Sequence, residues 1–213
     1  MSETEYDVIV AGYGPVGETC ANLLGYYGIK ALILDKEKNT YPLPRAITWD
    51  AECQRAMSHC EFLSEVKTRK IRGVDNKDAN KKSIMKITME GFDTYNYQHR
   101  ILFIHQPQFD EAHRENAKKY PTNTIKTGSE LLAVDEVNGI INCTYKNVDT
   151  DEKFTVKSKY LLACDGANST VRKLNGIKLN SLDADESWMV VDGYTKSSFE
   201  CFAEIDAIQY CNP

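Results

Sequence analysis

Three glycines near the start of the chain have the spacing of a phosphate-binding loop. In "GYGPVG" they fit G-x-G-x-x-G, where the first permits a tight turn, the second admits a pyrophosphate and the third lets a helix pack closely. Amides at a helix start lack intrahelical acceptors and lie at the positive end of the dipole, so they favour an anion. The pattern predicts a dinucleotide site, and glycines used only for close packing are the alternative. The predicted binding residues of this segment are Gly12, Gly14, Pro15, Val16 and Gly17.

An acidic residue follows at the distance that such a site requires. Asp35 ends the apolar run "ALILD", 21 positions after Gly14. A carboxylate there can accept hydrogen bonds from both hydroxyl groups of an adenosine ribose, and its charge would repel a 2′-phosphate. The motif therefore favours FAD or NAD over NADP, with Lys36 as a neighbouring binding residue.

Short hydrophobic patterns predict the elements that position this loop. Residues 7–11 are an apolar run bounded by glycine, which is typical of a buried parallel strand. Residues 30–35 have the same character, and the helix between these strands ends at Gly28. Strand, helix and strand form a βαβ unit with a right-handed crossover. The apolar side chains at helical spacing are Val16, Cys20, Leu23, Leu24 and Tyr27.

Beyond the second strand the pattern changes several times. We expect a helix over about 50–63, an exposed polar connection over 67–83, and antiparallel strands in "SIMKITME" and "YQHRILFIH". A helix beginning at "QPQFDEAHRENAKKY" follows, because proline suits a first turn and lysines suit a last one. Strands are predicted in "TNTIKTG", "ELLAVDEV", "IINCTYKNV" and "KFTVKSKYLLACDG", with a hairpin turn at Asn138–Gly139, and another strand begins in "ESWMVVDGYT".

Composition excludes several classes of function. With 213 residues, the chain can bury one large domain, or one domain and part of another. A net charge of −5 gives no excess of basic side chains for nucleic acid or an anionic membrane. No apolar run approaches the roughly 20 residues that span a bilayer, so we expect a cytoplasmic protein. Seven cysteines without a C-x-x-C pair indicate reduced thiols rather than disulfides or a metal site.

Four segments together resemble the single-component FAD-dependent aromatic hydroxylases, and within them the phenol hydroxylase and hydroxyphenylpropionate hydroxylase group. They are "VIVAGYGPVGETCANLLGYYG", "YPLPRAI", "HQPQFDEA" and "LLACDGANSTVRKLNGI". The resemblance implies an α/β fold: a Rossmann-like FAD-binding domain of the glutathione-reductase type, with a parallel sheet and a β-meander, over residues 1–180. Residues 181–213 would begin a mixed β-sheet substrate domain, to which residues 67–105 contribute strands.

The resemblance also implies roles for residues outside the glycine loop. Arg45 follows a proline and would lie against the flavin, although an exposed loop arginine is the plain alternative. Gln106 would contact the cofactor, or it would cap the helix that it begins. Asp165 and Gly166 match a motif at the pyrophosphate that is linked to the reduced nicotinamide, and Arg172 closes that motif or pairs with a neighbour. Asn168 and Ser169 are interpreted as the cap of a short helix.

The implied chemistry is hydroxylation of a small aromatic substrate by non-covalently bound FAD, with NADH or NADPH as electron donor and O2 as oxygen source. The cofactor performs the difficult step while the protein supplies orientation and a dry cavity, so no side-chain nucleophile or metal is required. We expect a fragment of a longer enzyme, inactive alone, whose full-length form is a candidate homodimer. An NAD-binding dehydrogenase module and a truncated, non-catalytic nucleotide-binding product remain the alternatives.

Overall fold

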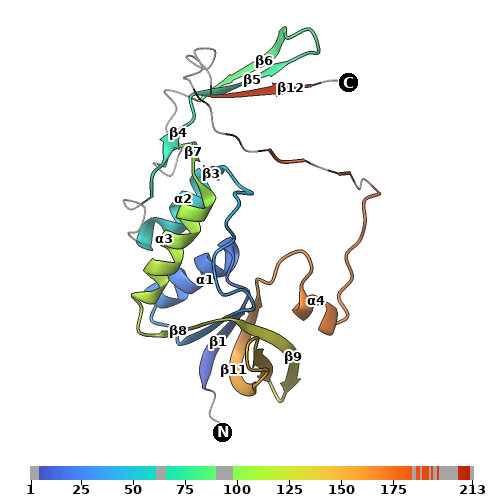
Figure 1. Ribbon diagram of the computed structural model, residues 1–213. Helices are drawn as coiled ribbons and strands as arrows, with labels where there is room; N and C mark the ends of the chain where they lie inside the picture. Colours follow the sequence, from blue (N-terminus) through green and yellow to red (C-terminus); the bar gives the residue numbers. More distant parts are fainter. Residues whose placement is uncertain are drawn as a thin grey trace. The chain divides into compact units, whose positions relative to one another are not determined.

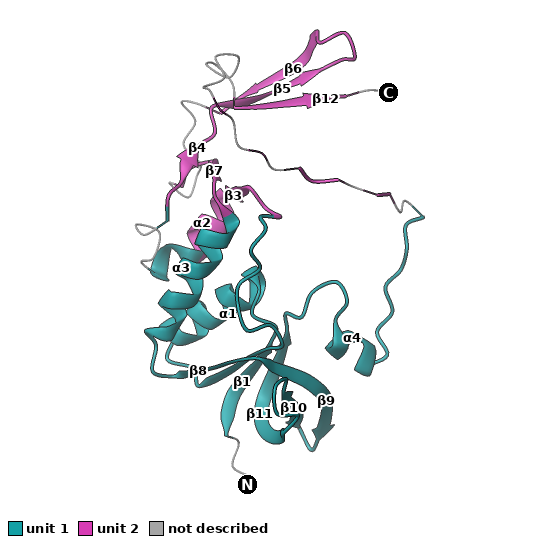
Figure 2. Cartoon of the chain, in the orientation of Figure 1, with its two compact units in different colours: residues 1–44, 57–66, 106–185 teal, residues 45–56, 67–105, 186–213 magenta. Residues whose placement is uncertain are grey.

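The computed structural model describes residues 5–60, 66–89 and 98–183, and of the remainder 186–187, 189–191, 193, 196 and 206–211. These residues form two compact units, shown in different colours in Figure 2. Unit 1 comprises residues 1–44, 57–66 and 106–185, and unit 2 comprises residues 45–56, 67–105 and 186–213. The predicted α/β class is confirmed, whereas the predicted boundary near residue 180 stays a prediction.

Unit 1 is built on a six-stranded sheet in the order β8-β2-β1-β11-β10-β9. The first four strands in this order are parallel to one another, and β10 and β9 continue the sheet as antiparallel hairpins, the predicted β-meander. Asn138 and Gly139 both have positive φ, which suits the two-residue turn between β9 and β10. The strands are β1 (Tyr6–Ala11), β2 (Ala31–Asp35), β8 (Asn123–Thr127), β9 (Ser129–Val137), β10 (Ile140–Asn147) and β11 (Lys153–Ala163), labelled in part in Figure 1.

Both faces of β1 and β2 are covered, as continuous apolar strands require. Alternate residues of β1 and β2 point to opposite faces. Val8, Val10 and Ile33 pack with Ala21 and Ala117 of the helices α1 (Pro15–Tyr26) and α3 (Gln106–Lys118). On the other face, a second core cluster joins the central strands to the meander and contains Ile9, Leu32, Leu34, Cys143, Tyr145 and Val156.

The buried face of α1 differs from the predicted one. The apolar positions Val16 and Tyr27 are 65% and 66% exposed. The predicted Cys20 and Leu24 pack against the core as partly buried side chains, whereas the fully buried positions are small and polar residues: Gly17, Glu18, Ala21, Asn22 and Gly25. The reason is a close approach to α3 and to the residues that follow it, because an added Cβ at Gly25 would lie 2.4 Å from the ring of Tyr120. Hydrogen bonds and close contact, rather than a wide apolar stripe, join these two helices.

Unit 2 contains two three-stranded sheets, in the orders β12-β5-β6 and β3-β7-β4. The predicted exposed connection over 67–83 is wrong, because it includes β4 and β5. The strands β6 and β7 occur as predicted but do not pair with each other. The described residues of "ESWMVVDGYT" form no strand. The elements are β3 (Thr48–Asp50), α2 (Ala51–Met57), β4 (Arg69–Lys70), β5 (Gly73–Lys77), β6 (Ser83–Thr88), β7 (Ile101–Phe103) and β12 (Ala207–Tyr210).

The helix predicted over about 50–63 is shorter in the structure. It consists of α2 and a single 3₁₀ turn, η1 (Ser58–Cys60), and residues 61–65 lie outside the described part. A last short helix, α4 (Thr170–Leu174), follows β11 in unit 1. None of the helices that the structure describes is long and apolar enough to cross a bilayer.

Candidate cofactor-binding site

The glycine loop joins β1 to α1, and two of its glycines are required by the protein itself. Gly12 has a φ of +94°, and an added Cβ would lie 2.4 Å from the carbonyl oxygen of Cys164. An added Cβ at Gly17 would lie 2.0 Å from the carbonyl oxygen of Gly12. These two residues are therefore glycine because the strand, the helix and the end of β11 meet there without room for a side chain.

Gly14 has neither reason to be glycine. Its φ of −86° and ψ of −171° are open to any residue, and an added Cβ would meet no protein atom within 4 Å. It is the N-cap of α1, with no side-chain cap and with Pro15 in the first turn. The following amides of Val16 and Gly17 lie where the helix offers no acceptor. The loop thus presents an uncovered backbone at the positive end of a helix of 12 residues.

Asp35 lies beside this loop, as the spacing predicts. Its Oδ2 accepts a hydrogen bond from the backbone N–H of Tyr13 at 3.1 Å, and its Oδ1 accepts one from the N–H of Glu37 at 3.0 Å. These two bonds hold the carboxylate in one orientation. Oδ2 also lies 3.4 Å from Arg114 Nη2, so it is Oδ1 that keeps a second lone pair for another donor. The neighbouring Lys36 is exposed and pairs with Glu37 at 3.9 Å.

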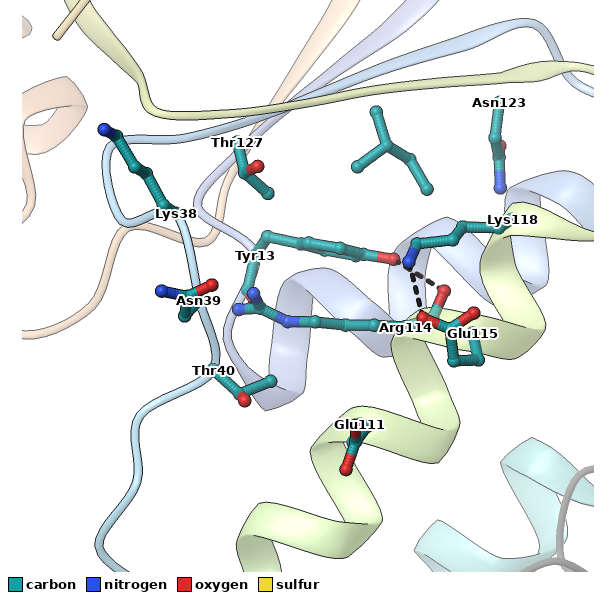
Figure 3. A pocket seen from close by; sticks show the side chains of 11 residues that line it. Tyr13, Lys38, Asn39, Thr40, Glu111, Arg114, Glu115, Lys118, Asn123 and Thr127 are labelled. Carbon is teal, nitrogen blue, oxygen red and sulfur yellow. Dashed lines mark hydrogen bonds and ion pairs between the residues drawn. The ribbon is translucent and has the colours of Figure 1, made fainter. Parts of the chain in front are cut away.

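A pocket of about 490 Å³ opens beside the loop. Its wall is formed by Tyr13, by the segment after β2, by α3 and by β8. Tyr13 and the segment after β2 place one end of it at the carboxyl ends of β1 and β2, where α/β proteins bind ligands, and from there it extends along β8. Figure 3 shows the side chains that surround it, with the guanidinium of Arg114 against the ring of Tyr13. The lining residues are Tyr13, Lys38, Asn39, Thr40, Glu111, Arg114, Glu115, Lys118, Asn123, Ile125 and Thr127.

Arg114 is a residue of this site that sequence reasoning missed. Its Nε donates to Glu18 Oε1 at 2.7 Å, its Nη2 donates to the carbonyl oxygen of Tyr13, and Nη2 lies 3.4 Å from Asp35 Oδ2. The guanidinium carbon is 4.6 Å from the centre of the Tyr13 ring. One signal was available: Glu18, Ala21, Asn22 and Gly25 have the i, i+3, i+4, i+7 spacing of a face that meets another helix closely.

Behind Arg114, acidic and imidazole groups are buried between α1 and α3. Burial raises the pKa of Glu18 to about 7, although the hydrogen bond from Arg114 opposes the rise. Burial and the charge of Glu18 raise the pKa of Asp110 to about 6. Burial lowers the pKa of His113 to about 4, and its Nδ1 lies 3.6 Å from Glu18 Oε2. Asn22 links the helices by donating to the carbonyl of His113 and accepting from Asn116.

The "DGANSTVR" segment forms a compact loop at the start of α4. Asp165 Oδ2 accepts from the backbone N–H groups of Thr170 and Val171, and Oδ1 accepts from the hydroxyl of Ser169 at 2.5 Å. The hydroxyl of Ser169 caps the helix through the N–H of Arg172, as predicted. The Asp165 carboxylate therefore holds the loop itself, while its backbone lies against Gly12.

The other residues of the motif have different surroundings. Gly166 has a φ of +78° with open space around it, so the turn requires glycine there. Arg172 is half-buried and its Nη1 donates to the carbonyl of Ala167, which closes the loop on itself. Their predicted contacts with the pyrophosphate stay predictions.

Two further predicted residues come from other segments of the chain. Gln106 is buried at the start of α3, where its amide donates to Asp110 Oδ2 at 3.2 Å. Arg45 belongs to unit 2. Their predicted contacts with the flavin stay predictions, as do those of the exposed Pro15 and Val16 with the pyrophosphate.

A pair of thiols lies under the glycine loop. The Sγ atoms of Cys20, in α1, and Cys164, at the end of β11, are 4.0 Å apart. The hydrogen bond between them lowers the pKa of Cys20 to about 7 and raises that of Cys164. Both are free thiols in the structure.

Comparison with known proteins identifies relatives of the whole arrangement. Residues 5–211 match the family model described as "FAD binding domain". The 3-(3-hydroxy-phenyl)propionate/3-hydroxycinnamic acid hydroxylase of Comamonas testosteroni is 30% identical over 193 residues, which are 90% of this chain and 32% of that protein. The protein of the same name from Escherichia coli O139:H28 (strain E24377A / ETEC) is 31% identical over 190 residues, covering 87% of this chain and 33% of that one. The chain thus spans about a third of the length of these relatives.

Solved structures show the same fold. The p-nitrophenol 4-monooxygenase PnpA from Pseudomonas putida DLL-E4 superimposes with a TM-score of 0.74 at 24% identity, covering 82% of this chain and 44% of that one. The flavin-dependent monooxygenase PieE, solved in complex with FAD and substrate, gives a TM-score of 0.70 at 18% identity, covering 82% and 33%.

Proposed function

Because the chain belongs to the FAD binding domain family, we propose that its residues form the FAD-binding part of a monooxygenase that hydroxylates a phenolic compound with NADH or NADPH and O2. The relatives named as hydroxylases of hydroxyphenylpropionate and hydroxycinnamic acid support this class of substrate. The bound flavin would supply the transfer of electrons and of one oxygen atom, which no protein side chain can perform. The chain's own residues bind and orient the dinucleotide.

Gly14 is the observation that carries the proposal. The protein places nothing within 4 Å of the position that its side chain would take, and its backbone conformation suits any residue. Glycine at such a position leaves room for a group from outside the chain. An anionic diphosphate fits there, because the first-turn amides of α1 and the positive end of the helix dipole face it.

Asp35 and the adjoining pocket would hold the adenosine end of the dinucleotide. The carboxylate is oriented by the backbone of Tyr13 and Glu37, and its Oδ1 retains a lone pair for a ribose hydroxyl. The pocket of about 490 Å³ is within the range of cofactor sites in proteins. The negative charge of Asp35 disfavours a phosphate on the ribose, so FAD is expected in preference to NADP at this loop.

A flavin titration tests the proposal. The 213-residue chain is expected to bind FAD, with a change in flavin fluorescence and a visible absorption band that stay with the protein through gel filtration. Unfolding in urea should release all of the flavin, since the binding is non-covalent. NAD in equal concentration should not displace it. If the folded chain retains NAD and no flavin, a dehydrogenase module replaces this proposal.

Turnover is a separate measurement. The FAD-loaded chain is expected not to couple oxidation of NADH or NADPH to hydroxylation of 3-(3-hydroxyphenyl)propionate, because it spans about a third of the length of the hydroxylases it resembles. Hydroxylated product from these 213 residues would show that the remaining two thirds of the relatives are dispensable.

A further inference from the structure

Arg114 contacts three separate parts of the proposed cofactor site with one side chain. Through Nε it binds Glu18 of α1, through Nη2 it binds the carbonyl of Tyr13 in the glycine loop, and Nη2 lies 3.4 Å from Asp35 at the end of β2. The side chain is 12% exposed and comes from α3, an element outside the βαβ unit. A planar guanidinium with fixed donors can make such contacts simultaneously, which a lysine cannot.

The contact with Tyr13 has a consequence for Gly14. A peptide group is planar and trans, so its carbonyl and the N–H of the next residue point in opposite directions. By holding the carbonyl of Tyr13, Arg114 fixes the direction in which the N–H of Gly14 points, namely away from α3. The space around Gly14 on the outer side of the loop is open.

The contact with Asp35 is also directional. Oδ2 of Asp35, the oxygen that accepts from the N–H of Tyr13, is the one that faces Arg114. The guanidinium and this amide together hold the carboxylate plane, which sets the direction of its remaining lone pairs. Glu18, buried to 1% exposure, anchors the guanidinium through Nε.

We propose that Arg114 is a positioning residue for the dinucleotide: it aims the N–H of Gly14 at the diphosphate and the carboxylate of Asp35 at the adenosine ribose. This inference rests on the proposed binding of FAD. It predicts that loss of Arg114 lowers affinity for FAD and also weakens discrimination for the ribose hydroxyls. If Arg114 only stabilised the fold, its loss would lower the affinity for FAD but would leave the discrimination for the ribose hydroxyls unchanged.

The experiment compares FAD with an analogue that lacks the 2′-hydroxyl of the adenosine ribose. Dissociation constants for both are measured by flavin fluorescence in the unaltered chain and in Arg114→Met. The unaltered chain should bind FAD roughly tenfold more tightly than the analogue, as expected for a hydrogen bond to a charged group. In Arg114→Met, affinity for FAD should fall roughly tenfold or more, and the preference over the analogue should fall to about twofold or less.

Arg55→Met is the matched control, because Arg55 is an exposed arginine of α2 in an ion pair with Glu52. It should keep both the affinity and the preference. Arg114→Lys serves if Arg114→Met fails to unfold cooperatively in urea. Its preference should fall too, since the donors of an ammonium radiate from one nitrogen and do not reproduce the separate Nε and Nη2 positions that bind Glu18 and the Tyr13 carbonyl. An unchanged preference in a folded Arg114 variant overturns the inference alone. Failure of the unaltered chain to bind FAD overturns the proposed function and this inference with it.

Discussion

Replacement of Gly14 should separate cofactor binding from folding. In Gly14→Ala, the new methyl group meets no protein atom within 4 Å, and the backbone angles need no change. The restricted unfolded chain favours folding by about 0.4–1 kcal/mol. Alanine is a poorer N-cap than glycine, which costs a similar amount. The free energy of unfolding without cofactor should therefore stay within about 1 kcal/mol of the unaltered value.

Cofactor affinity should change far more. The diphosphate would lie against the backbone of Gly14, in the open space that a Cβ would take, so a methyl group would push it away from the N–H groups of the loop. Loss of one hydrogen bond to a charged group corresponds to about 1.5–3 kcal/mol, which raises the dissociation constant roughly 10- to 150-fold. In Gly14→Val, the two further methyl groups should abolish retention of the flavin.

The assay pairs a flavin fluorescence titration with urea unfolding of the cofactor-free chain. Gly193→Ala is the matched control, because this glycine of unit 2 also has open space around its Cβ position and no positive φ. It should leave affinity and stability unchanged. Gly14→Ala with undiminished affinity for FAD would refute the assignment of Gly14 to the diphosphate.

Three further predictions concern residues that support the glycine loop and α1. Gly17→Ala should destabilise the cofactor-free chain by about 1–3 kcal/mol in urea unfolding, because the new Cβ would lie 2.0 Å from the Gly12 carbonyl, and an unchanged midpoint would contradict that geometry. The pKa of Asp110 is raised to about 6 in the folded chain. Protonation of Asp110 therefore stabilises the fold fully below the pKa that this group has in the unfolded chain, and the stabilisation is lost as pH rises through 6. The free energy of unfolding of Asp110→Asn, relative to that of the unaltered chain, should accordingly rise by up to about 3 kcal/mol between about pH 4 and about pH 7. The same difference between the two proteins at both pH values would refute this. Hydrogen peroxide should oxidise Cys20 and Cys164, 4.0 Å apart, to a disulfide with release of water, seen in a non-reducing peptide digest and absent from Cys20→Ser; two sulfinic acids without a cross-link would exclude the pairing.

Local signals account for the parts of the fold that the sequence predicted. The run from Tyr6 to Asp35 carries its own strand, turn and helix signals, and the structure has β1, α1 and β2 there. The hairpin turn at Asn138–Gly139 is likewise set by two residues that accept positive φ. The cap of α4 by Ser169 depends on the N–H of Arg172, only three positions later.

The missed features depend on contacts between distant parts of the chain. Hydrophobic spacing predicted only part of the buried face of α1. Cys20 and Leu24 pack against the core, but the most buried positions include Glu18 and Asn22, which bind polar side chains of α3. No residue beside Arg114 in the sequence marks its role, and its contact with Glu18, 96 positions away, is not encoded in any local pattern. β5 was missed in the segment 67–83, where it pairs with β12 about 130 positions later.

The pairing of β1 with β11 also constrains how the cofactor groove is made on the ribosome. Asp7 and Lys159, 152 positions apart, are joined at one end of these strands, and at the other end Gly12 lies against Cys164. At synthesis rates of about 5–20 residues per second, β11 is synthesised roughly 8–30 seconds after β1 and the glycine loop. A nascent chain therefore exposes the apolar strands β1 and β2 for this interval. The flavin would be acquired only after residues 164–165 have left the exit tunnel.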